Sequence, residues 1–206
     1  MTTAGVFASA DDMRTISASG SASGLALLVI VAGGCHRGPK TPEAAYLLLE
    51  RAVAAGDAAS FYPLLDQPTR WAIESTLHDQ RLMRTIISAK YPEADAKKEL
   101  ARLAFAEEAD ATRYFVRVNQ DRHTVESLRR RLGSVSGPVK TKVMAADDIY
   151  VARQDGMPFR FHRNANGTWG FSELASEWSL ERDKASHAVK TVRDNAALYQ
   201  KADNSQ

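Results

Sequence analysis

The feature that most constrains this chain is a short apolar run, Gly24–Gly34, that ends at Cys35, the only cysteine among 206 residues. A helix needs about 20 apolar residues to cross a bilayer, so this run is too short for that role. It fits the apolar core of a secretory signal, with small residues before a cleavage point. We therefore expect residues 1–34 to be a signal peptide, and only the chain after them to fold into a domain.

The residues at the cleavage point resemble the lipobox of bacterial lipoproteins, in which an apolar residue and two small residues precede a cysteine. Here they are Ala32-Gly33-Gly34-Cys35, with alanine where leucine is most usual. The resemblance implies that Cys35 is lipidated and anchors the protein in a membrane. His36, rather than aspartate, follows the cysteine, which in that family favours the outer over the inner membrane. A free thiol in the leader and an uncleaved membrane anchor are the alternatives.

The leader is acidic at its start. Residues 1–12 carry Asp11 and Asp12 and no basic side chain, whereas a signal peptide begins with positive charge. Met13 followed by Arg14 provides that charge and gives a leader of ordinary length. We therefore expect translation to begin at Met13.

Charge and composition limit which classes of function this chain can have. The full chain has 27 basic and 25 acidic side chains, and residues 1–34 hold one arginine and two aspartates, so the remainder has a formal charge of +3. This near-neutral balance predicts no nucleic-acid partner. A single cysteine excludes an internal disulfide. The remaining length suits one globular domain, and we expect no cofactor.

Helical patterns dominate the first half of the mature chain. A short polar tether over residues 35–40 precedes Thr41-Pro42-Glu43, which combines a capping side chain, a first-turn proline and an acidic residue. Gly56 is expected to end this helix. Further helices are expected over residues 57–65, 68–90, 92–108, 122–132 and 177–201, followed by a disordered tail over 202–206.

Two of these segments carry specific expectations. The helix over residues 68–90 has an imperfect apolar face made of Trp71, Leu77, Met83, Ile86 and Ile87. Residues 111–118 are ambiguous: Tyr114, Val116 and Val118 alternate as in a strand, but Phe115 does not fit that alternation.

The second half predicts a small antiparallel sheet. Strands are expected over residues 140–144 and 148–153. Phe159–Arg163 and Trp169–Phe171 alternate large and polar residues around the turn Asn164–Gly167, which predicts a hairpin. Its large rings, Phe159, Phe161, Trp169 and Phe171, share one face. The expected class is therefore α+β: N-terminal helices, a small antiparallel sheet and a C-terminal helix within one domain over residues 41–201.

Two stretches, residues 41–57 and Asn166-Gly167-Thr168-Trp169, resemble the opening helix and terminal strand pair of secreted NTF2-like (cystatin-like) domains. The resemblance implies a curved sheet around a long helix, with a cone-shaped pocket. That pocket would be lined by Phe159, Phe161, His162, Trp169 and Phe171. Residues 68–132 contain more helix than that family has, so an unrelated helical domain with a small sheet is the alternative.

Several polar residues were weighed as chemical sites. Glu74 and His78 share a helix face, but two ligands do not make a zinc site. His162 would carry protons only if it faced a pocket; otherwise it is a solvent-facing strand residue. Asp147, Asp148 and Asp155 are best explained as turn residues, because neighbouring strand residues point to opposite faces.

Arg129, Arg130 and Arg131 form the densest basic cluster, which could contact lipid headgroups or an acidic partner but more often is solvated helix surface. With no catalytic constellation, we expect a non-catalytic, membrane-anchored lipoprotein that binds a protein or envelope component. The alternative is a small-ligand-binding or enzymatic NTF2-like domain that uses the aromatic pocket. A third hypothesis is a structural spacer whose helical middle packs on a partner.

Overall fold

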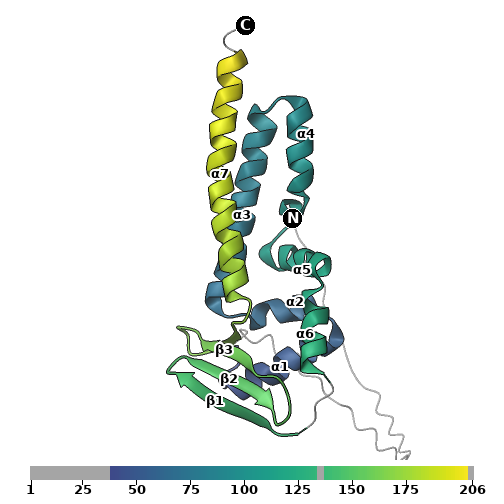
Figure 1. The fold of residues 1–206 in the computed structure, drawn as a ribbon, viewed down its shortest axis with the longest axis vertical. Helices are drawn as coiled ribbons and strands as arrows, with labels where there is room; N and C mark the ends of the chain where they lie inside the picture. Colours follow the sequence, from purple (N-terminus) through teal and green to yellow (C-terminus); the bar gives the residue numbers. More distant parts are fainter. Residues whose placement is uncertain (1–37, 134–136, 204–206) are drawn as a thin grey trace, which may run out of the picture. The chain divides into compact units, whose positions relative to one another are not determined.

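The computed structural model describes residues 38–133 and 137–203, all within the unit Cys35–Gln206. The predicted signal peptide and Cys35 lie outside the described residues. Within them, helices come first, an antiparallel sheet follows and a long helix comes last (Figure 1), so the predicted α+β class is confirmed. The resemblance to NTF2-like domains is not confirmed and stays a prediction.

The elements in chain order are α1 (Pro42–Ala55), α2 (Ala58–Phe61), the 3₁₀ helix η1 (Tyr62–Leu64), α3 (Gln67–Lys90), α4 (Glu93–Arg102), the 3₁₀ helix η2 (Ala104–Glu107), α5 (Ala111–Arg122), α6 (Thr124–Leu132), β1 (Val139–Ala145), β2 (Asp148–Arg153), β3 (Phe159–Arg163), β4 (Trp169–Phe171) and α7 (Ala175–Asp203).

The ends of α1 follow from local sequence. The Thr41 side chain accepts a hydrogen bond from the backbone N–H of Ala44, and Pro42 occupies the first turn. Gly56 ends the helix in the left-handed region, at φ 70°, where a side chain would be strained. The carboxylate of Asp57 then caps α2 through the N–H of Ser60. The predicted boundaries are confirmed here because each depends only on neighbouring residues.

The sheet is an antiparallel meander in the order β1-β2-β3-β4. Phe161 pairs with Phe171 across the predicted hairpin, and Arg163 pairs with Trp169. The large rings therefore share one face, as predicted, and that face packs on α1: the Tyr46 ring lies 6.2 Å from that of Phe159 and 6.4 Å from that of Phe161. Burial of these rings forms the main core.

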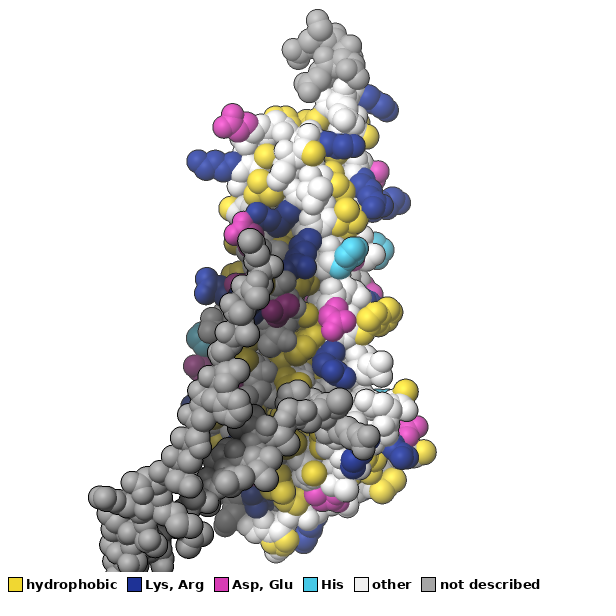
Figure 2. Space-filling view, turned by 180° about the vertical axis from the view of Figure 1, so that it is seen from behind, with side chains coloured by type: hydrophobic (Ala, Val, Ile, Leu, Met, Phe, Trp, Pro, Cys, Tyr) yellow, Lys and Arg dark blue, Asp and Glu magenta, His cyan; other side chains and the backbone are white. Residues whose placement is uncertain are grey.

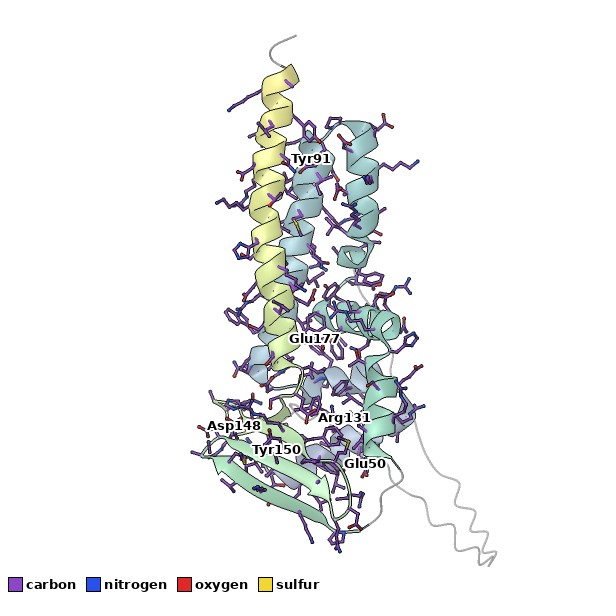
Figure 3. All side chains as sticks on the ribbon, in the orientation of Figure 1. Glu50, Tyr91, Arg131, Asp148, Tyr150 and Glu177 are labelled. Carbon is purple, nitrogen blue, oxygen red and sulfur yellow. The ribbon has the colours of Figure 1, made fainter. Side chains whose placement is uncertain are left out.

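Helices α3 and α7 lie side by side and run in the same direction (Figure 1). Near their C-terminal ends the Tyr91 hydroxyl donates to the carbonyl of Val192 at 3.2 Å, and its ring lies 4.9 Å from that of Tyr199 (Figure 3). Met83, Ile87 and Val189 form the buried cluster at this end, and Ala196 of α7 is also buried. This second cluster is therefore much smaller than the main core.

Three segments differ from the sequence-based expectation. The helix expected over residues 92–108 is divided at Leu103 into α4 and η2. Residues 111–118 are helical, because Asp110 caps α5 and Tyr114, Phe115 and Val118 are buried at helical spacing. His123 adopts φ 52° and separates α5 from α6, so the helix expected from Arg122 begins at Thr124.

Both ends of the expected domain also differ. Helix α7 continues to Asp203, so residues 202 and 203 belong to it rather than to a disordered tail. At the other end, the carbonyl of Pro39 accepts a hydrogen bond from the N–H of Trp169 at 2.9 Å. The Lys40 ammonium donates to the carbonyl of Asn166 at 3.3 Å. The predicted tether is thus held on the β3–β4 turn from residue 38 onward.

Candidate functional site

The four aromatic residues expected to line a pocket are instead buried in the core. Phe159, Phe161 and Phe171 are fully buried and Trp169 is 8 % exposed. Ring centroids of Phe159 and Phe171 are 6.0 Å apart, and those of Phe161 and Phe171 are 5.9 Å apart. These rings occupy the space between α1 and the sheet in which the pocket was expected.

His162, the fifth predicted pocket residue, lies on the opposite face of the hairpin. Its Nδ1 is 3.3 Å from Oδ1 of Asp148, the strand neighbour with which it pairs. The Arg160 guanidinium also binds Asp148, at 3.0 Å. The Asp148 carboxylate therefore contacts both Arg160 and His162. Asp147 and Asp155 lie in separate turns at opposite ends of β2, while Asp148 belongs to the strand itself rather than to a turn.

Trp71 is the residue whose position differs most from the sequence-based expectation. Buried residues of α3 recur at Thr69, Ala72, Ile73, Thr76 and Leu77, which places Trp71 on another side of the helix. Its side chain is 60 % exposed, and the Arg182 guanidinium of α7 lies over its ring at 5.6 Å. Trp71 is therefore separate from the buried side of α3, although the sequence placed it on the same apolar face as Leu77 and Met83.

Three adjoining hollows meet at Trp71, and we call them together the Trp71 groove. Their volumes are about 700, 470 and 550 Å³. The groove lies between the first half of α3, the β3–β4 turn and the first turns of α7. Its defining residues are Pro68, Trp71, Glu74, His162, Ala165 and Arg182.

One wall of the groove is fixed by the start of α3. The Asn164 side chain is buried and accepts a hydrogen bond from the N–H of Gln67 at 2.7 Å, which joins the β3–β4 turn to the helix. The buried Asp66 carboxylate caps the same helix through the N–H of Thr69 at 3.0 Å. Burial raises the pKa of Asp66, although its hydrogen bonds with Thr69 act in the opposite direction.

The charges around the groove are mixed in sign. Oε1 of Glu74 accepts a hydrogen bond from the Tyr62 hydroxyl at 3.2 Å, and burial together with this carboxylate raises the pKa of Tyr62. His78 lines the groove beside Glu74. Among the described residues, no three histidine, cysteine or carboxylate side chains could hold a metal ion. Figure 2 shows basic and acidic side chains interspersed along the helical face of the domain.

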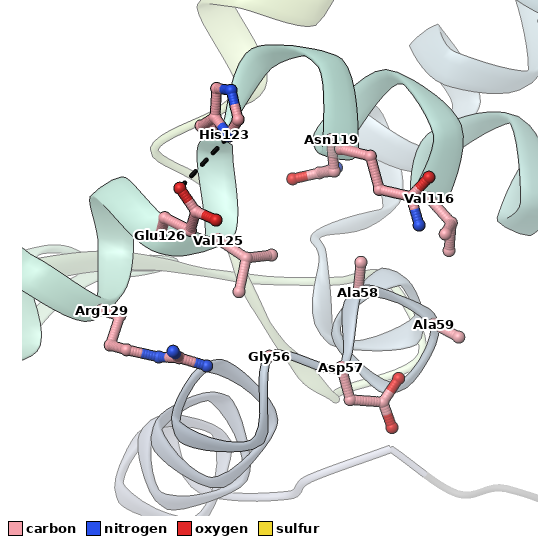
Figure 4. Close-up of a pocket in the computed structure, with 11 residues that line it drawn as sticks. Gly56, Asp57, Ala58, Ala59, Val116, Asn119, His123, Val125, Glu126 and Arg129 are labelled. Atoms are coloured by element: carbon pink, nitrogen blue, oxygen red, sulfur yellow. Dashed lines mark ion pairs between the residues drawn. The ribbon is translucent and has the colours of Figure 1, made fainter.

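A second, smaller hollow of about 310 Å³ lies where the α1–α2 junction meets α5 and α6 (Figure 4). Nδ1 of His123 is 3.2 Å from Oε2 of Glu126 on its edge. Asn119 is buried there; its Nδ2 donates to the carbonyl of Phe115 at 3.0 Å, while its Oδ1 has no partner among the described residues. This hollow carries polar groups but no set of side chains that converges on a reacting atom.

The basic cluster at residues 129–131 is largely structural. The Arg129 guanidinium donates to the carbonyls of Val53 and Ala54 at the end of α1, at 3.2 and 3.1 Å. Arg131 lies over the Phe159 ring at 4.7 Å and binds Glu173 at 2.7 Å. Two of the three arginines are thus engaged within the domain, which leaves Arg130 for solvent.

The chain matches no protein-family model, and no curated protein or solved structure is detectably similar to it. Its function must therefore be argued from its own residues. The Trp71 groove contains three candidate polar residues named from the sequence, Glu74, His78 and His162, whereas Trp71 was expected only as part of an imperfect apolar helix face. The exposure of Trp71 follows from which side of α3 is buried, and packing decides that rather than the local sequence.

Proposed function

We propose that this protein is a lipid-anchored component of the bacterial cell envelope that binds a protein partner through the Trp71 groove. The observation that carries the proposal is Trp71 itself: a large ring, 60 % exposed, at the meeting point of three hollows. Tryptophan and arginine are enriched among residues that dominate binding energy at protein interfaces. Trp71 and Arg182 supply both types in one stacked pair.

The surroundings of Trp71 also suit a protein partner. An interface typically has an apolar centre within a polar edge. Here Trp71, Pro68 and Leu180 provide apolar surface, and Leu180 is itself 55 % exposed. Glu74 and Arg182 carry opposite charges at the edge. A small ligand between the hairpin rings is less well supported, because those rings are buried in the core.

Anchoring rests on the sequence around Cys35, with the outer membrane favoured. Among the described residues, no helix is both long and apolar enough to span a bilayer. The anchor is tested by replacing Cys35 with serine and following the protein in membrane and soluble fractions. Release into the soluble fraction is expected. Retention in the membrane fraction would contradict the lipid anchor.

The groove is tested with a photoreactive amino acid in place of Leu180, at the groove edge, in cells that make the full chain. We expect a discrete crosslinked product that disappears when Trp71 is also replaced by alanine. The matched control places the same probe at Leu198, which is 63 % exposed near the end of α7, and should give no such product. A product at Leu180 that persists in the Trp71→Ala variant would contradict the proposal.

A further inference from the structure

We infer that one end of the sheet lies against the bilayer that holds the lipid anchor, with phospholipid headgroups as its partner. This inference rests on the proposed anchoring at Cys35. The surface consists of exposed side chains at the β1–β2 and β3–β4 turns and on the docked segment beside them. We call it the sheet rim: Lys40, Lys142, Val143, Met144 and Arg163.

Only a short length of chain connects the sheet rim to Cys35. The segment at Pro39 and Lys40 is held on the β3–β4 turn by hydrogen bonds to Trp169 and Asn166, at 2.9 and 3.3 Å. Two residues separate Gly38 from Cys35, and even fully extended the three Cα–Cα steps between them span at most about 11 Å. A lipid on Cys35 would therefore hold this turn close to the membrane surface.

The meander brings the β1–β2 and β3–β4 turns to the same end of the sheet. Strands β1 and β3 run in one direction and β2 and β4 in the other, so the β1–β2 and β3–β4 turns are neighbours. The N–H of Arg163 donates to the carbonyl of Asp147 at 2.8 Å, which joins the two turns directly. With strands about 4.8 Å apart, the rim extends for roughly 20 Å from Lys40 to Met144.

The sheet rim combines exposed apolar side chains with exposed cations. Val143 is 68 % exposed and Met144 is 59 % exposed, and both lie near the end of β1, where they could enter the headgroup layer. Lys40, Lys142 and Arg163 are exposed cations that suit lipid phosphates. Figure 2 shows hydrophobic, basic and acidic side chains side by side at the foot of the view.

Acidic side chains at this end do not cancel the basic ones. Asp148 is occupied by Arg160 and His162, at 3.0 and 3.3 Å. This leaves Asp147 as the exposed carboxylate of the β1–β2 turn. The combination of exposed apolar tips with several surrounding cations favours a membrane surface over contact with a neutral or basic protein.

The proposed orientation also determines where the Trp71 groove lies relative to the membrane. Asn164, which accepts the hydrogen bond from Gln67, lies in the β3–β4 turn, and Trp71 follows Gln67 by about one helical turn. The groove would thus open beside the membrane surface. A partner that uses it would approach along the membrane rather than from the opposite end of the sheet.

The test uses the full, lipidated chain in vesicles of phosphatidylethanolamine and phosphatidylglycerol. Because lipidation would consume Cys35, a cysteine introduced elsewhere is the only free thiol for a fluorescent label. Met144→Cys reports on the rim. Met157→Cys is the matched control, since Met157 is 54 % exposed in the β2–β3 turn at the other end of the strands. Val143→Cys serves as a second rim reporter, and circular dichroism verifies that each variant is folded.

We expect a spin label on the lipid headgroups to quench the label at Met144 at least threefold more than the label at Met157, and aqueous iodide to show the reverse order. Equal quenching at both ends, or stronger headgroup quenching at Met157, would overturn the orientation. Flotation with the vesicles separates the two proposals. A protein that floats but shows equal quenching refutes the orientation alone, whereas a protein that does not float refutes the lipid anchor and the orientation with it.

Discussion

Gly170 of β4 lies against the backbone of Asp66, so closely that a Cβ atom at position 170 would be 2.4 Å from the Asp66 Cα and 2.6 Å from its nitrogen. The N–H of Asp66 donates to the carbonyl of Phe171 at 3.1 Å, and Leu65 forms a parallel bridge with Phe171. The chain leading into α3 therefore sits directly on the last strand. This contact positions the start of α3, and with it one wall of the Trp71 groove.

Replacing Gly170 with alanine should destabilise the domain by about 3 kcal/mol or more, because backbone atoms cannot move aside as a flexible side chain can. Urea unfolding of the two proteins measures the effect. Gly156→Ala is the control, because a Cβ there would meet neighbours only at ordinary contact distances, the nearest at 3.5 Å. Equal stability of Gly170→Ala and the parent chain would contradict the close approach.

Asn164→Ala should lower the free energy of unfolding by about 1–3 kcal/mol, because it removes the oxygen that accepts the part-buried hydrogen bond from the N–H of Gln67. It also removes the donor to the Thr168 hydroxyl, at 3.1 Å. Chemical denaturation measures the loss. Asn195→Ala, an exposed change within α7, should leave stability nearly unchanged or slightly higher, since alanine favours helix. Similar losses in both variants would refute the role of Asn164.

Asp66→Asn should raise the free energy of unfolding relative to the parent chain, and this gain should be larger at pH 7 than at pH 4. Burial raises the pKa of Asp66 in the folded state, so the folded protein holds this proton more tightly than the unfolded protein does. The parent chain therefore loses stability as pH rises from the ordinary aspartate pKa through the folded value. Asparagine keeps the capping oxygen without the charge. A stability difference that does not change between pH 4 and pH 7 would contradict this.

Tyr114→Phe should reduce the loss of stability in alkaline solution. Burial raises the pKa of Tyr114 to about 12, while an unfolded tyrosine ionises near pH 10. The folded state thus retains the proton over that interval, and the free energy of unfolding falls as pH rises through it. The free energy of unfolding should therefore fall less steeply with pH in the variant between pH 9.5 and 11.5. Tyr150→Phe, which changes a half-buried tyrosine on the outer side of the sheet, is the control. If the free energy of unfolding had the same pH dependence in Tyr114→Phe and the parent chain, the prediction would be refuted.

The far end of the helix pair should open more readily than the main core. Helix α4 has no buried residue, and the cluster beside it centres on Met83, Ile87 and Val189. Amide hydrogens of α4 should exchange with solvent faster than those of α1, because fewer buried contacts break on local opening. Ile87→Ala, at a cost of about 2–5 kcal/mol, should accelerate exchange in α4 more than in α1. Uniform acceleration across both helices would show that the two clusters unfold together.

Local sequence predicted the elements whose signals are contained within a few residues. Thr41 and Gly56 bound α1 because a cap and a left-handed turn depend on adjacent backbone groups. The alternation around Phe161 and Phe171 likewise predicted the hairpin and its buried face. The helix expected over residues 92–108 was only partly correct, since the chain turns at Leu103.

The segment at residues 111–118 shows where local patterns were insufficient. Tyr114 and Val118 fit a strand and a helix equally well, and Phe115 decides the matter through contacts with distant residues. Its ring lies 5.6 Å from that of Phe61 and 6.1 Å from that of Trp178. Burying Phe115 together with Tyr114 and Val118 on one side requires a helix. The deciding partners lie some 50 to 60 residues away, so no local window could reveal them.

The sequence by itself determined the α+β order of elements, the caps of α1, the hairpin and the expectation of a lipid anchor at Cys35, because each depends on residue types at short spacing. Only the tertiary structure decided that the hairpin rings fill the core, that Trp71 is exposed and that the chain before α1 is held on the β3–β4 turn. Those outcomes depend on which surfaces meet, as Gly170 and Asp66 do, across about 100 residues of intervening chain. Short-range periodicity determines which residues can be buried, and long-range packing determines which of them are.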